Sequence, residues 1–164
     1  MLFDLKDIFM NEGMSSSKNY DLDLSKLDVD GCFPFTTPVH VKAKVMNTAG
    51  IVSITLETEY DYTRPCDRCF TDTKSHMNEK FSHKLIESLQ EDYNDDYIET
   101  PDMVLDVDDL VTSDILLNLP HKYLCKEDCQ GLCQKCGKNL NLGSCDCEKK
   151  DIDPRLEKLK ELLN

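Results

Sequence analysis

The sequence lacks any run of about 18 apolar residues, the length that a transmembrane helix needs, so it predicts no membrane span. Its first residues, MLFDLKDIFMNEG, interrupt a short apolar stretch with acids and offer no cleavage site of small residues, which predicts no signal peptide. A chain without an export signal stays in the reducing cytoplasm, where paired cysteines more often bind metal or do redox work than form disulfides. The odd count of nine cysteines also fits a disulfide framework poorly. We therefore expect a soluble, cytoplasmic, metal-binding protein.

The sequence also lacks the signatures of common enzyme sites. It contains neither a P-loop nor a dinucleotide-binding fingerprint. A nucleophile would need a base and a group that orients this base, but the four histidines lie on strand-like segments without recognisable partners. Acidic pairs such as Asp95–Asp96 and Asp108–Asp109 are typical of solvated surfaces. No catalytic residue is predicted, and we expect the protein not to be an enzyme.

Positive charge is missing from the middle of the chain, where no Lys or Arg occurs between Lys84 and Lys122. Such an acidic stretch is typical of a solvated surface or of a face that attracts basic partners. The net charge of −13 argues against nonspecific binding to duplex DNA. Both cysteine-bearing segments are nevertheless locally basic, with five basic against three acidic residues in 64–84 and six against four in 122–150. The stretch contains eleven acids: Glu87, Glu91, Asp92, Asp95, Asp96, Glu99, Asp102, Asp106, Asp108, Asp109 and Asp114.

Three segments before the acidic stretch have strand patterns. Residues 39–46 alternate between apolar and polar side chains, as do residues 52–62, and a turn at Gly50 separates them. Together they predict an antiparallel hairpin that leads directly into Cys66. Residues 73–86 fit either a helix or a strand by spacing, but their Thr, Ser and Phe content favours a strand that pairs with the second one.

Two helices are predicted beyond the acidic connector of residues 90–104. The first has Asp106 as its N-cap and Asp109 in its first turn, and it ends at Pro120. The second, within residues 151–164, has Pro154 at its first position and a stripe of leucines.

Eight of the nine cysteines form four closely spaced pairs. Zinc takes four donors in a tetrahedron, with thiolates about 2.3 Å from the metal, and a C-x2-C turn presents two thiolates on one side of it. The segment from Cys133 to Gly137 has the form of a zinc knuckle, because the glycine lets the backbone bend towards sulfur. Four such pairs indicate zinc, most simply two ions. The pairs are Cys66–Cys69, Cys125–Cys129, Cys133–Cys136 and Cys145–Cys147.

The four pairs combine two by two in three ways, and the sequence does not choose between them. Cys145 and Cys147 follow Cys136 so closely that the tail can close a site of four sulfurs by itself. Cys66 and Cys69 would then share a site with Cys125 and Cys129 and fasten the tail to the sheet. Ligand type alone leaves an iron–sulfur cluster open. Redox thiols are disfavoured, because no C-x2-C pair opens a helix in a βαβ context.

The remaining candidates have ordinary structural explanations. Cys32 lies next to Phe33 and is expected to be a packing thiol. His40, His76, His83 and His121 are expected at the surface, although His121 is near enough to Cys125 to replace a ligand. The predicted fold class is α+β, an antiparallel sheet with a few packing helices and a C-terminal zinc-knuckle module. The expected domains are an α+β core over 1–121, a cysteine-rich module over 122–150 and a helix over 151–164.

The order of motifs resembles a known family. The hairpin ends in Cys-Asp-Arg-Cys-Phe at 66–70, an acidic stretch and a helix follow, and the tail contains Gly-Leu-Cys-Gln-Lys-Cys-Gly-Lys-Asn-Leu-Asn at 131–141 and Cys-Asp-Cys at 145–147. This resembles the bacterial YceD family, the large ribosomal RNA subunit accumulation proteins, in its Gram-positive form with an extended cysteine-rich tail. Gln134 departs from the proline common in such tails. Relatives with shortened tails keep the other two pairs, which implies that Cys66, Cys69, Cys125 and Cys129 form one site.

The resemblance implies a role in ribosome assembly, through accumulation or processing of the large-subunit ribosomal RNA. We expect a non-enzymatic factor that contacts this RNA or its precursor particle. Zinc would hold the cysteine-bearing turns rigid and so position basic side chains to contact RNA phosphates. The negative net charge nevertheless predicts that RNA binding is weak and salt-sensitive. An alternative is an acidic adaptor, with residues 87–114 engaging a basic ribosomal protein; a third is a thiol-redox or zinc-stress sensor. The candidate RNA-binding residues are Arg64, Arg68, Lys126, Lys135 and Lys138.

Overall fold

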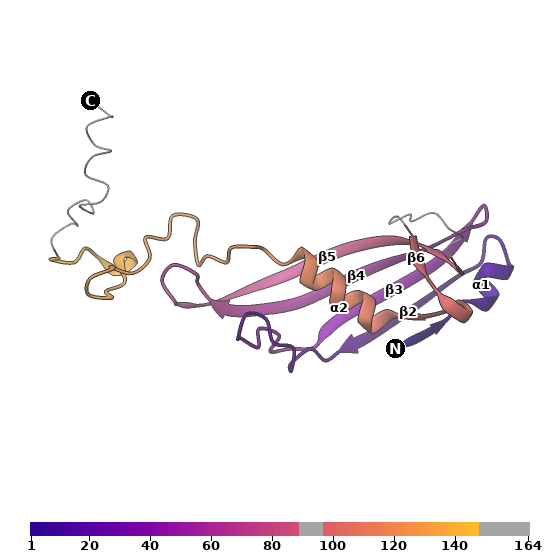
Figure 1. Cartoon of the computed structure of the whole chain (residues 1–164), viewed down its shortest axis with the longest axis horizontal. Coiled ribbons are helices and arrows are strands. Elements are labelled where there is room, and N and C mark those ends of the chain that lie inside the picture. Colours follow the sequence, from indigo (N-terminus) through magenta and orange to yellow (C-terminus); the bar gives the residue numbers. More distant parts are fainter. Residues whose placement is uncertain (89–96, 148–164) are drawn as a thin grey trace, which may run out of the picture.

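The computed structural model describes residues 1–88 and 97–147. Figure 1 shows a long, twisted sheet with one helix lying across one of its faces and the cysteine-rich segment at one end. The strands of the larger sheet follow the order β2–β3–β4–β5–β6. The elements are β1 (Leu2–Asp4), α1 (Lys6–Met10), β2 (Ser15–Leu22), β3 (Val39–Thr48), β4 (Ile51–Pro65), β5 (Asp72–Ile86), β6 (Tyr97–Glu99), β7 (Val104–Asp106) and α2 (Val107–Asn118), with short 3-10 helices at Pro101–Met103 and Leu140–Leu142.

The predicted hairpin is confirmed as β3 and β4. They pair antiparallel with Val45 opposite Ile54. A two-residue loop joins them, and both Ala49 (φ 52°) and Gly50 (φ 82°) have positive φ, as a hairpin turn that matches strand twist requires. The strand prediction for residues 73–86 is also confirmed, because β5 pairs antiparallel with β4 along nearly its whole length.

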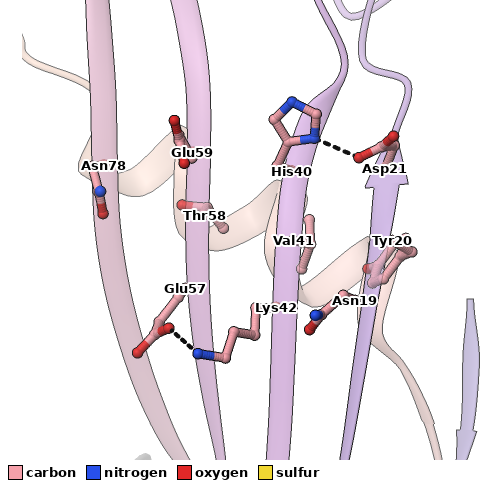
Figure 2. Close-up of a pocket in the computed structure, with 10 residues that line it drawn as sticks. All are labelled: Asn19, Tyr20, Asp21, His40, Val41, Lys42, Glu57, Thr58, Glu59 and Asn78. Carbon is pink, nitrogen blue, oxygen red and sulfur yellow. Dashed lines mark hydrogen bonds and ion pairs between the residues drawn. The ribbon is translucent and has the colours of Figure 1, made fainter.

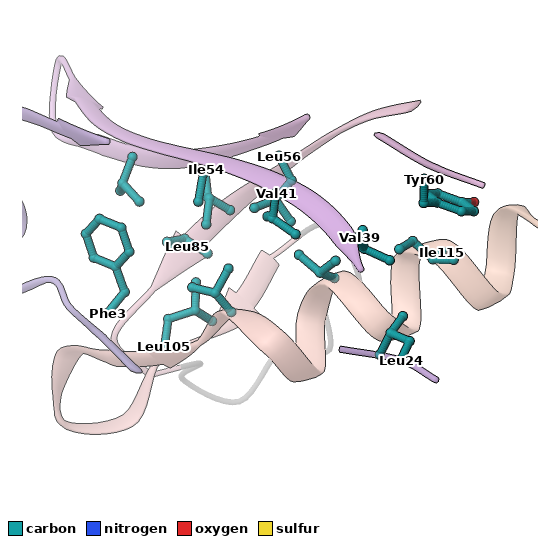
Figure 3. Close-up of a cluster of buried hydrophobic side chains, with 14 of the residues drawn as sticks. Phe3, Leu24, Val39, Val41, Ile54, Leu56, Tyr60, Leu85, Leu105 and Ile115 are labelled. Carbon is teal, nitrogen blue, oxygen red and sulfur yellow. The ribbon is translucent and has the colours of Figure 1, made fainter. Parts of the chain in front are cut away.

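The core lies between the sheet and α2. Apolar residues at alternate positions of β3 and β4 are buried, as the sequence pattern predicted. Figure 3 shows side chains from the strands facing Ile115 of α2 and Leu105 of β7 across this interior. Phe3 closes one end of the core and Tyr60 lies towards the other. The fold is therefore α+β, as expected.

Helix α2 begins and ends where the sequence predicts. The Asp106 side chain accepts a hydrogen bond from the amide of Asp108, 3.0 Å long, which caps the first turn. The helix ends at Asn118, just before Pro120. Its buried acid, Asp114, lies 2.8 Å from Nε2 of His83 on β5. This polar contact fixes the helix to the inner face of the sheet.

The N-terminal segment and residues 97–106 contain elements that the sequence pattern did not indicate. β2 adds an edge strand beside β3, and β1 pairs with β7. Residues 97–103, expected as part of a connector, form β6 and a 3-10 turn, with β6 parallel to β5. The predicted terminal helix at 151–164 and residues 89–96 lie outside the described residues. No helix among the described residues is long and apolar enough to cross a membrane.

Candidate metal centres

The first set of cysteines lies at the end of the sheet, where β4 turns into β5. The turn is closed by main-chain hydrogen bonds from Cys66 to Thr71 and from Phe70 to Cys66, each 2.9 Å long. Phe70 adopts a left-handed conformation (φ 56°), which lets the chain reverse directly after Cys69. Both thiols are therefore held on the inside of a rigid turn, where they are buried.

Cys125 and Cys129 complete this set from the segment after α2. The Cys66 and Cys129 sulfurs are 3.8 Å apart, and those of Cys69 and Cys125 are 3.6 Å apart. All four sulfurs lie within 4.8 Å of one another. Sulfurs at the corners of a tetrahedron with metal–sulfur bonds of about 2.3 Å are about 3.8 Å apart. The set therefore has the size that one tetrahedral metal ion requires.

A reciprocal pair of hydrogen bonds joins the two halves of the first set. The amide of Asp67 donates to the carbonyl of Tyr123 over 2.9 Å. The amide of Tyr123 donates to the Asp67 carboxylate over 2.6 Å. The Tyr123 hydroxyl also lies 2.8 Å from the Ser75 hydroxyl and 3.1 Å from the carbonyl of Tyr62. Tyr123 therefore attaches the tail to the hairpin one residue before Leu124 leads into Cys125.

Arg68 supports the same arrangement from inside the Cys66–Cys69 turn. Its guanidinium donates to the carbonyl of Cys129 over 2.8 Å. Its own carbonyl accepts from the amide of Leu132 over 3.2 Å. The tail passes so close to Arg68 that a Cβ on Gly131 would lie 3.0 Å from this carbonyl oxygen, and Gly131 has a φ of +71°. Glycine is required there by both space and backbone conformation.

Two asparagines in the tail reach back to the first set. The Asn141 side chain donates from Nδ2 to the sulfur of Cys129, 3.3 Å away, and its Oδ1 accepts from the main-chain amide of Gln130. Asn139 caps the 3-10 turn at Leu140–Leu142 by accepting from the amide of Asn141. The Asn-Leu-Asn motif at 139–141 therefore has a physical role, because it holds the loop around Cys129 against the second module.

The second set lies wholly within residues 133–147. The four sulfurs of Cys133, Cys136, Cys145 and Cys147 lie within 4.8 Å of one another. The knuckle turn is closed by a hydrogen bond of 2.8 Å from Gly137 to the carbonyl of Cys133, and Gly137 has a φ of 72°. Cys136 is exposed, whereas Cys66, Cys69 and Cys129 of the first set are buried. The second set is thus a surface module, and the first is part of the packed structure.

The thiols of the first set differ in acidity. Burial raises the pKa of Cys66, but main-chain hydrogen bonds within the site outweigh burial and bring it down to about 6. The hydroxyl and amide of Thr71 lower the pKa of Cys69. Burial, together with the neighbouring sulfurs, raises the pKa of Cys125 to about 12. The amides already stabilise thiolate at Cys66, and thiolate is the form that binds metal.

The second set repeats this division. Main-chain hydrogen bonds from Cys136 and Lys135 lower the pKa of Cys133 to about 6. The sulfur of Cys136, with burial as a smaller cause, raises the pKa of Cys147 to about 12. In both sets, main-chain amides of a C-x2-C turn hydrogen-bond to the first sulfur of that turn and lower its pKa. The thiol with the raised pKa belongs to the other pair of the set.

The structure selects one of the three combinations of cysteine pairs, and it is the one that the resemblance implied. His121 is exposed and belongs to neither set of four. Cys32 is half-buried and also lies outside both sets. Sequence reasoning did not identify Asp67, Tyr123 or Thr71 as supporting residues. The roles of Asp67 and Tyr123 depend on a contact across 56 positions of chain, for which a single sequence offers no signal, whereas Thr71 acts within the Cys66–Cys69 turn itself.

The candidate RNA-binding residues are placed differently from one another. Arg64 is largely enclosed, with 18% of its side chain exposed, and contacts Asp67 and Asp30. Arg68 is engaged with Cys129. Lys126 lies 3.7 Å from Asp128 at the surface. Among the residues described, the exposed cations of the knuckle are Lys135 and Lys138, and the Lys138 ammonium donates to the carbonyl of Ser144.

Comparison with known proteins gives a family match and one related protein. The family model described as large ribosomal RNA subunit accumulation protein YceD matches residues 54–163, a range that contains all eight paired cysteines. A protein of Bacillus subtilis (strain 168) described as uncharacterized protein YlbN is 27% identical over 143 residues, which are 86% of this chain and 82% of that protein. No solved structure is a significant match.

Proposed function

The chain belongs to the YceD family of large ribosomal RNA subunit accumulation proteins, and we propose that it is a non-enzymatic zinc-binding factor in ribosome assembly. It supports accumulation and processing of the large-subunit ribosomal RNA. The observation that carries the proposal is the family match itself, since residues 54–163 include both cysteine sets and helix α2, which separates the two halves of the first set in the chain. The reducing cytoplasm is where such thiol sets keep their metal, and we place the protein there.

We propose zinc as the metal of both sets. Four thiolates suit zinc and iron alike. Sulfurs that all lie within 4.8 Å of one another fit one ion, whereas several iron ions between them would push some thiolates further apart. Zinc has no redox chemistry and supplies a fixed tetrahedral cross-link, which suits a structural role. In the first set this cross-link would join the β4–β5 turn to the tail.

The proposed partner is the large-subunit ribosomal RNA or its precursor particle. Among the candidate residues at the cysteine end, the exposed lysines that could meet phosphates are Lys126, Lys135 and Lys138. Arg64 and Arg68 contribute indirectly, because their guanidinium groups hold the turn in shape. Contacts to phosphate position a protein on RNA without reading sequence, so they suit a factor that recognises an assembling particle.

The function is tested in cells depleted of the protein and complemented with variants. Replacing both Cys66 and Cys69 with serine should lower the ratio of large- to small-subunit ribosomal RNA to the level of depleted cells. Cys32→Ser is the matched control, since Cys32 lies in neither set and should restore the ratio fully. If depletion itself leaves the ratio unchanged, the proposed function is wrong.

The acidic stretch supports a second candidate, an adaptor that keeps a basic ribosomal protein soluble before assembly. Exposed acids such as Asp102 lie in a region without a single Lys or Arg. Crosslinking in cells, with identification of bound RNA and bound protein, separates the two candidates. Crosslinks to precursor ribosomal RNA favour the first; co-purification of a basic ribosomal protein without RNA crosslinks favours the adaptor.

A further inference from the structure

The sheet has a second face, which no helix covers in the part of the chain that the structure describes. Helix α2 packs against one face of the sheet (Figure 1). Side chains at alternate positions of β2 to β5 lie on the other face. Pairing register arranges these outward side chains in rows across the sheet. One row is Asn19, Lys42, Glu57 and Lys80, and the next is Ser17, Lys44, Thr55 and Ser82.

One half of this face is basic, although the whole chain carries a charge of −13. We call this half the lysine half; it consists of Lys42, Lys44, Lys80 and Lys84, all exposed. Two of the described carboxylates share this half: Glu57 lies 3.0 Å from both Lys42 and Lys80, and Glu99 of β6 lies opposite Ile86, on the same face as Tyr97 and Lys84. Four lysines against two glutamates leave a net charge of +2 on this half. Lys44 has no carboxylate within ion-pair distance among the described residues.

The other half of the same face is acidic, because Asp21, Glu59 and Asp61 lie there against one lysine, Lys74. Asp21 lies 2.5 Å from His40, and Lys74 lies 2.8 Å from Asp61. His76 contacts Asp61 over 3.2 Å. Figure 2 shows the boundary between the two halves, with the His40–Asp21 contact on one side and the Lys42–Glu57 pair on the other. The excess of positive charge is therefore confined to the half that is distant from the cysteine sets.

Hydroxyl groups and an aromatic ring complete the lysine half. Small hydroxyl side chains stand between the lysines in the same rows: Ser15, Ser17, Ser53, Thr55 and Ser82. Each can donate a hydrogen bond to a phosphate oxygen. At the β6 edge the Lys84 ammonium lies 5.4 Å from the centre of the Tyr97 ring. The lysine half thus combines point charges, neutral donors and one ring on a twisted strand surface.

We propose that the lysine half binds the phosphate backbone of RNA and is the principal RNA contact of this protein. The proposal rests on the RNA-directed function proposed above and names the surface that performs it. Strands lie about 4.8 Å apart and outward residues along a strand are about 6.7 Å apart, so the four ammonium groups span roughly 15 Å. Several successive phosphates of one strand fit within that span.

An acidic protein fits this surface less well. Protein interfaces depend on buried aromatic and apolar anchors, and the one large apolar side chain within these rows is Met46, which is 39% exposed. A backbone of phosphates needs only charge and hydrogen-bond donors, which this face supplies. The acidic stretch elsewhere on the chain would then keep RNA away from other faces, so that RNA meets the protein in one orientation.

The test measures binding of a fluorescently labelled 20-nucleotide oligouridine and of a 20-base-pair RNA duplex to the zinc-loaded protein at several salt concentrations. Four phosphate contacts to a single strand predict a slope of log K against log salt of about −3, or roughly a 50-fold loss of affinity from 50 to 200 mM salt. Replacing Lys44 and Lys84 with glutamine should reduce the slope by about 1.4. Lys44→Arg with Lys84→Arg should retain binding, because the charges remain.

Two control variants make the outcome specific. Lys6→Gln with Lys26→Gln removes the same charge from exposed positions off this face and should leave the slope unchanged. Lys135→Gln with Lys138→Gln removes the cations of the knuckle. If the knuckle variant loses RNA binding while the Lys44 and Lys84 variant does not, the proposal is overturned and the proposed function stands.

Two further outcomes also count against the proposal. A wild-type protein that binds neither RNA probe, or that binds a 20-residue polyglutamate peptide more tightly than RNA, overturns it. In depleted cells, the Lys44 and Lys84 glutamine variant should fail to restore the ribosomal RNA ratio, whereas the Lys6 and Lys26 variant should restore it. Failure of wild-type complementation itself would instead count against the proposed function.

Discussion

Asp67 and Tyr123 hydrogen-bond to each other in both directions although 56 positions separate them in the chain. Asp67 lies inside the Cys66–Cys69 turn, and Tyr123 lies two residues before Cys125. The pair therefore aligns the two halves of the first cysteine set without help from a metal. It makes this set part of the folded core, whereas the second set is formed by local chain alone.

Metal analysis should find two zinc ions per chain. Cys69→Ser should leave one zinc and lower the melting temperature strongly, because the first set joins the hairpin to the tail. Cys136→Ser should also leave one zinc but shift the melting temperature less, since its set is a surface module. Mass spectrometry of the native protein and elemental analysis provide the count. Iron in place of zinc would contradict the metal assignment.

Removing the Asp67 side chain should weaken the first site. Asp67→Ala leaves the amide of Tyr123 without its partner and removes one of the two carboxylates that contact Arg64, which should lower the free energy of unfolding by about 1–3 kcal/mol. Zinc affinity of the first set should fall with it, as measured by competition with a chromophoric chelator. Asp72→Ala, at an exposed position of β5, is the control and should change neither quantity. Equal effects of the two variants would contradict the role assigned to Asp67.

The Tyr123 hydroxyl should contribute to stability on its own. Tyr123→Phe keeps the ring packed against Tyr62 but removes the donor to the Tyr62 carbonyl and the contact with Ser75. We expect a loss of about 1–2 kcal/mol in urea denaturation. Tyr97→Phe, at the partly exposed β6 edge, provides the comparison and should cost less.

Position 131 should require glycine for two reasons, its positive φ and its close approach to the Arg68 carbonyl. Gly131→Ala must adopt a positive φ and also meet the Arg68 carbonyl at 3.0 Å, whereas Gly13→Ala adopts a similar φ of +78° in open space. The first variant should lose clearly more than the second, for which the cost of a left-handed alanine is on the order of 1 kcal/mol. Comparable losses, measured by thermal unfolding at matched zinc content, would show that the close approach to Arg68 does not matter.

The stability of the metal-free, reduced protein should vary with pH through its thiols. The pKa of Cys66 is lowered to about 6 in the folded protein. The stabilisation that its thiolate provides is therefore fully present above pH 9 and is lost as pH falls towards 6. The pKa of Cys125 is raised to about 12, so the folded protein favours the protonated thiol. The stability associated with this thiol is fully present below pH 9 and is lost as pH rises towards 12. The free energy of unfolding should therefore rise from pH 6 to 9 and fall beyond it.

This profile is measurable by urea denaturation in the presence of a chelator and a reductant. Thiolate absorbance near 240 nm reports the same titrations directly. Cys66→Ser should make the limb between pH 6 and 9 less steep, with the remaining slope due mainly to Cys133, and should leave the alkaline limb in place. An unchanged acidic limb in that variant would show that another group causes it.

The sequence predicted most of the sheet, for a physical reason. Strict alternation between Val39 and Val45 specifies which face of β3 is buried, because a strand with one buried face admits no other register of side chains. The capping of α2 by Asp106 was also readable, since caps depend on neighbouring residues. β2 escaped prediction because it is an edge strand of mainly polar residues, and its pairing with β3 supplies the stability that its own pattern does not indicate.

By itself, the sequence determined what depends on short spacing: the hairpin, the capped helix, and the paired cysteines with their affinity for a soft metal. Only the tertiary structure decided which cysteine pairs share a site. Cys66 and Cys129 are some sixty residues apart in the chain, and contacts of Tyr123 and Arg68 bring them together. The tertiary structure also enclosed Arg64, engaged Arg68, and gathered lysines of β3 and β5 on one uncovered face. Which residues of different strands become neighbours depends on the long-range pairing of those strands, and the composition of a single segment carries no information about this pairing.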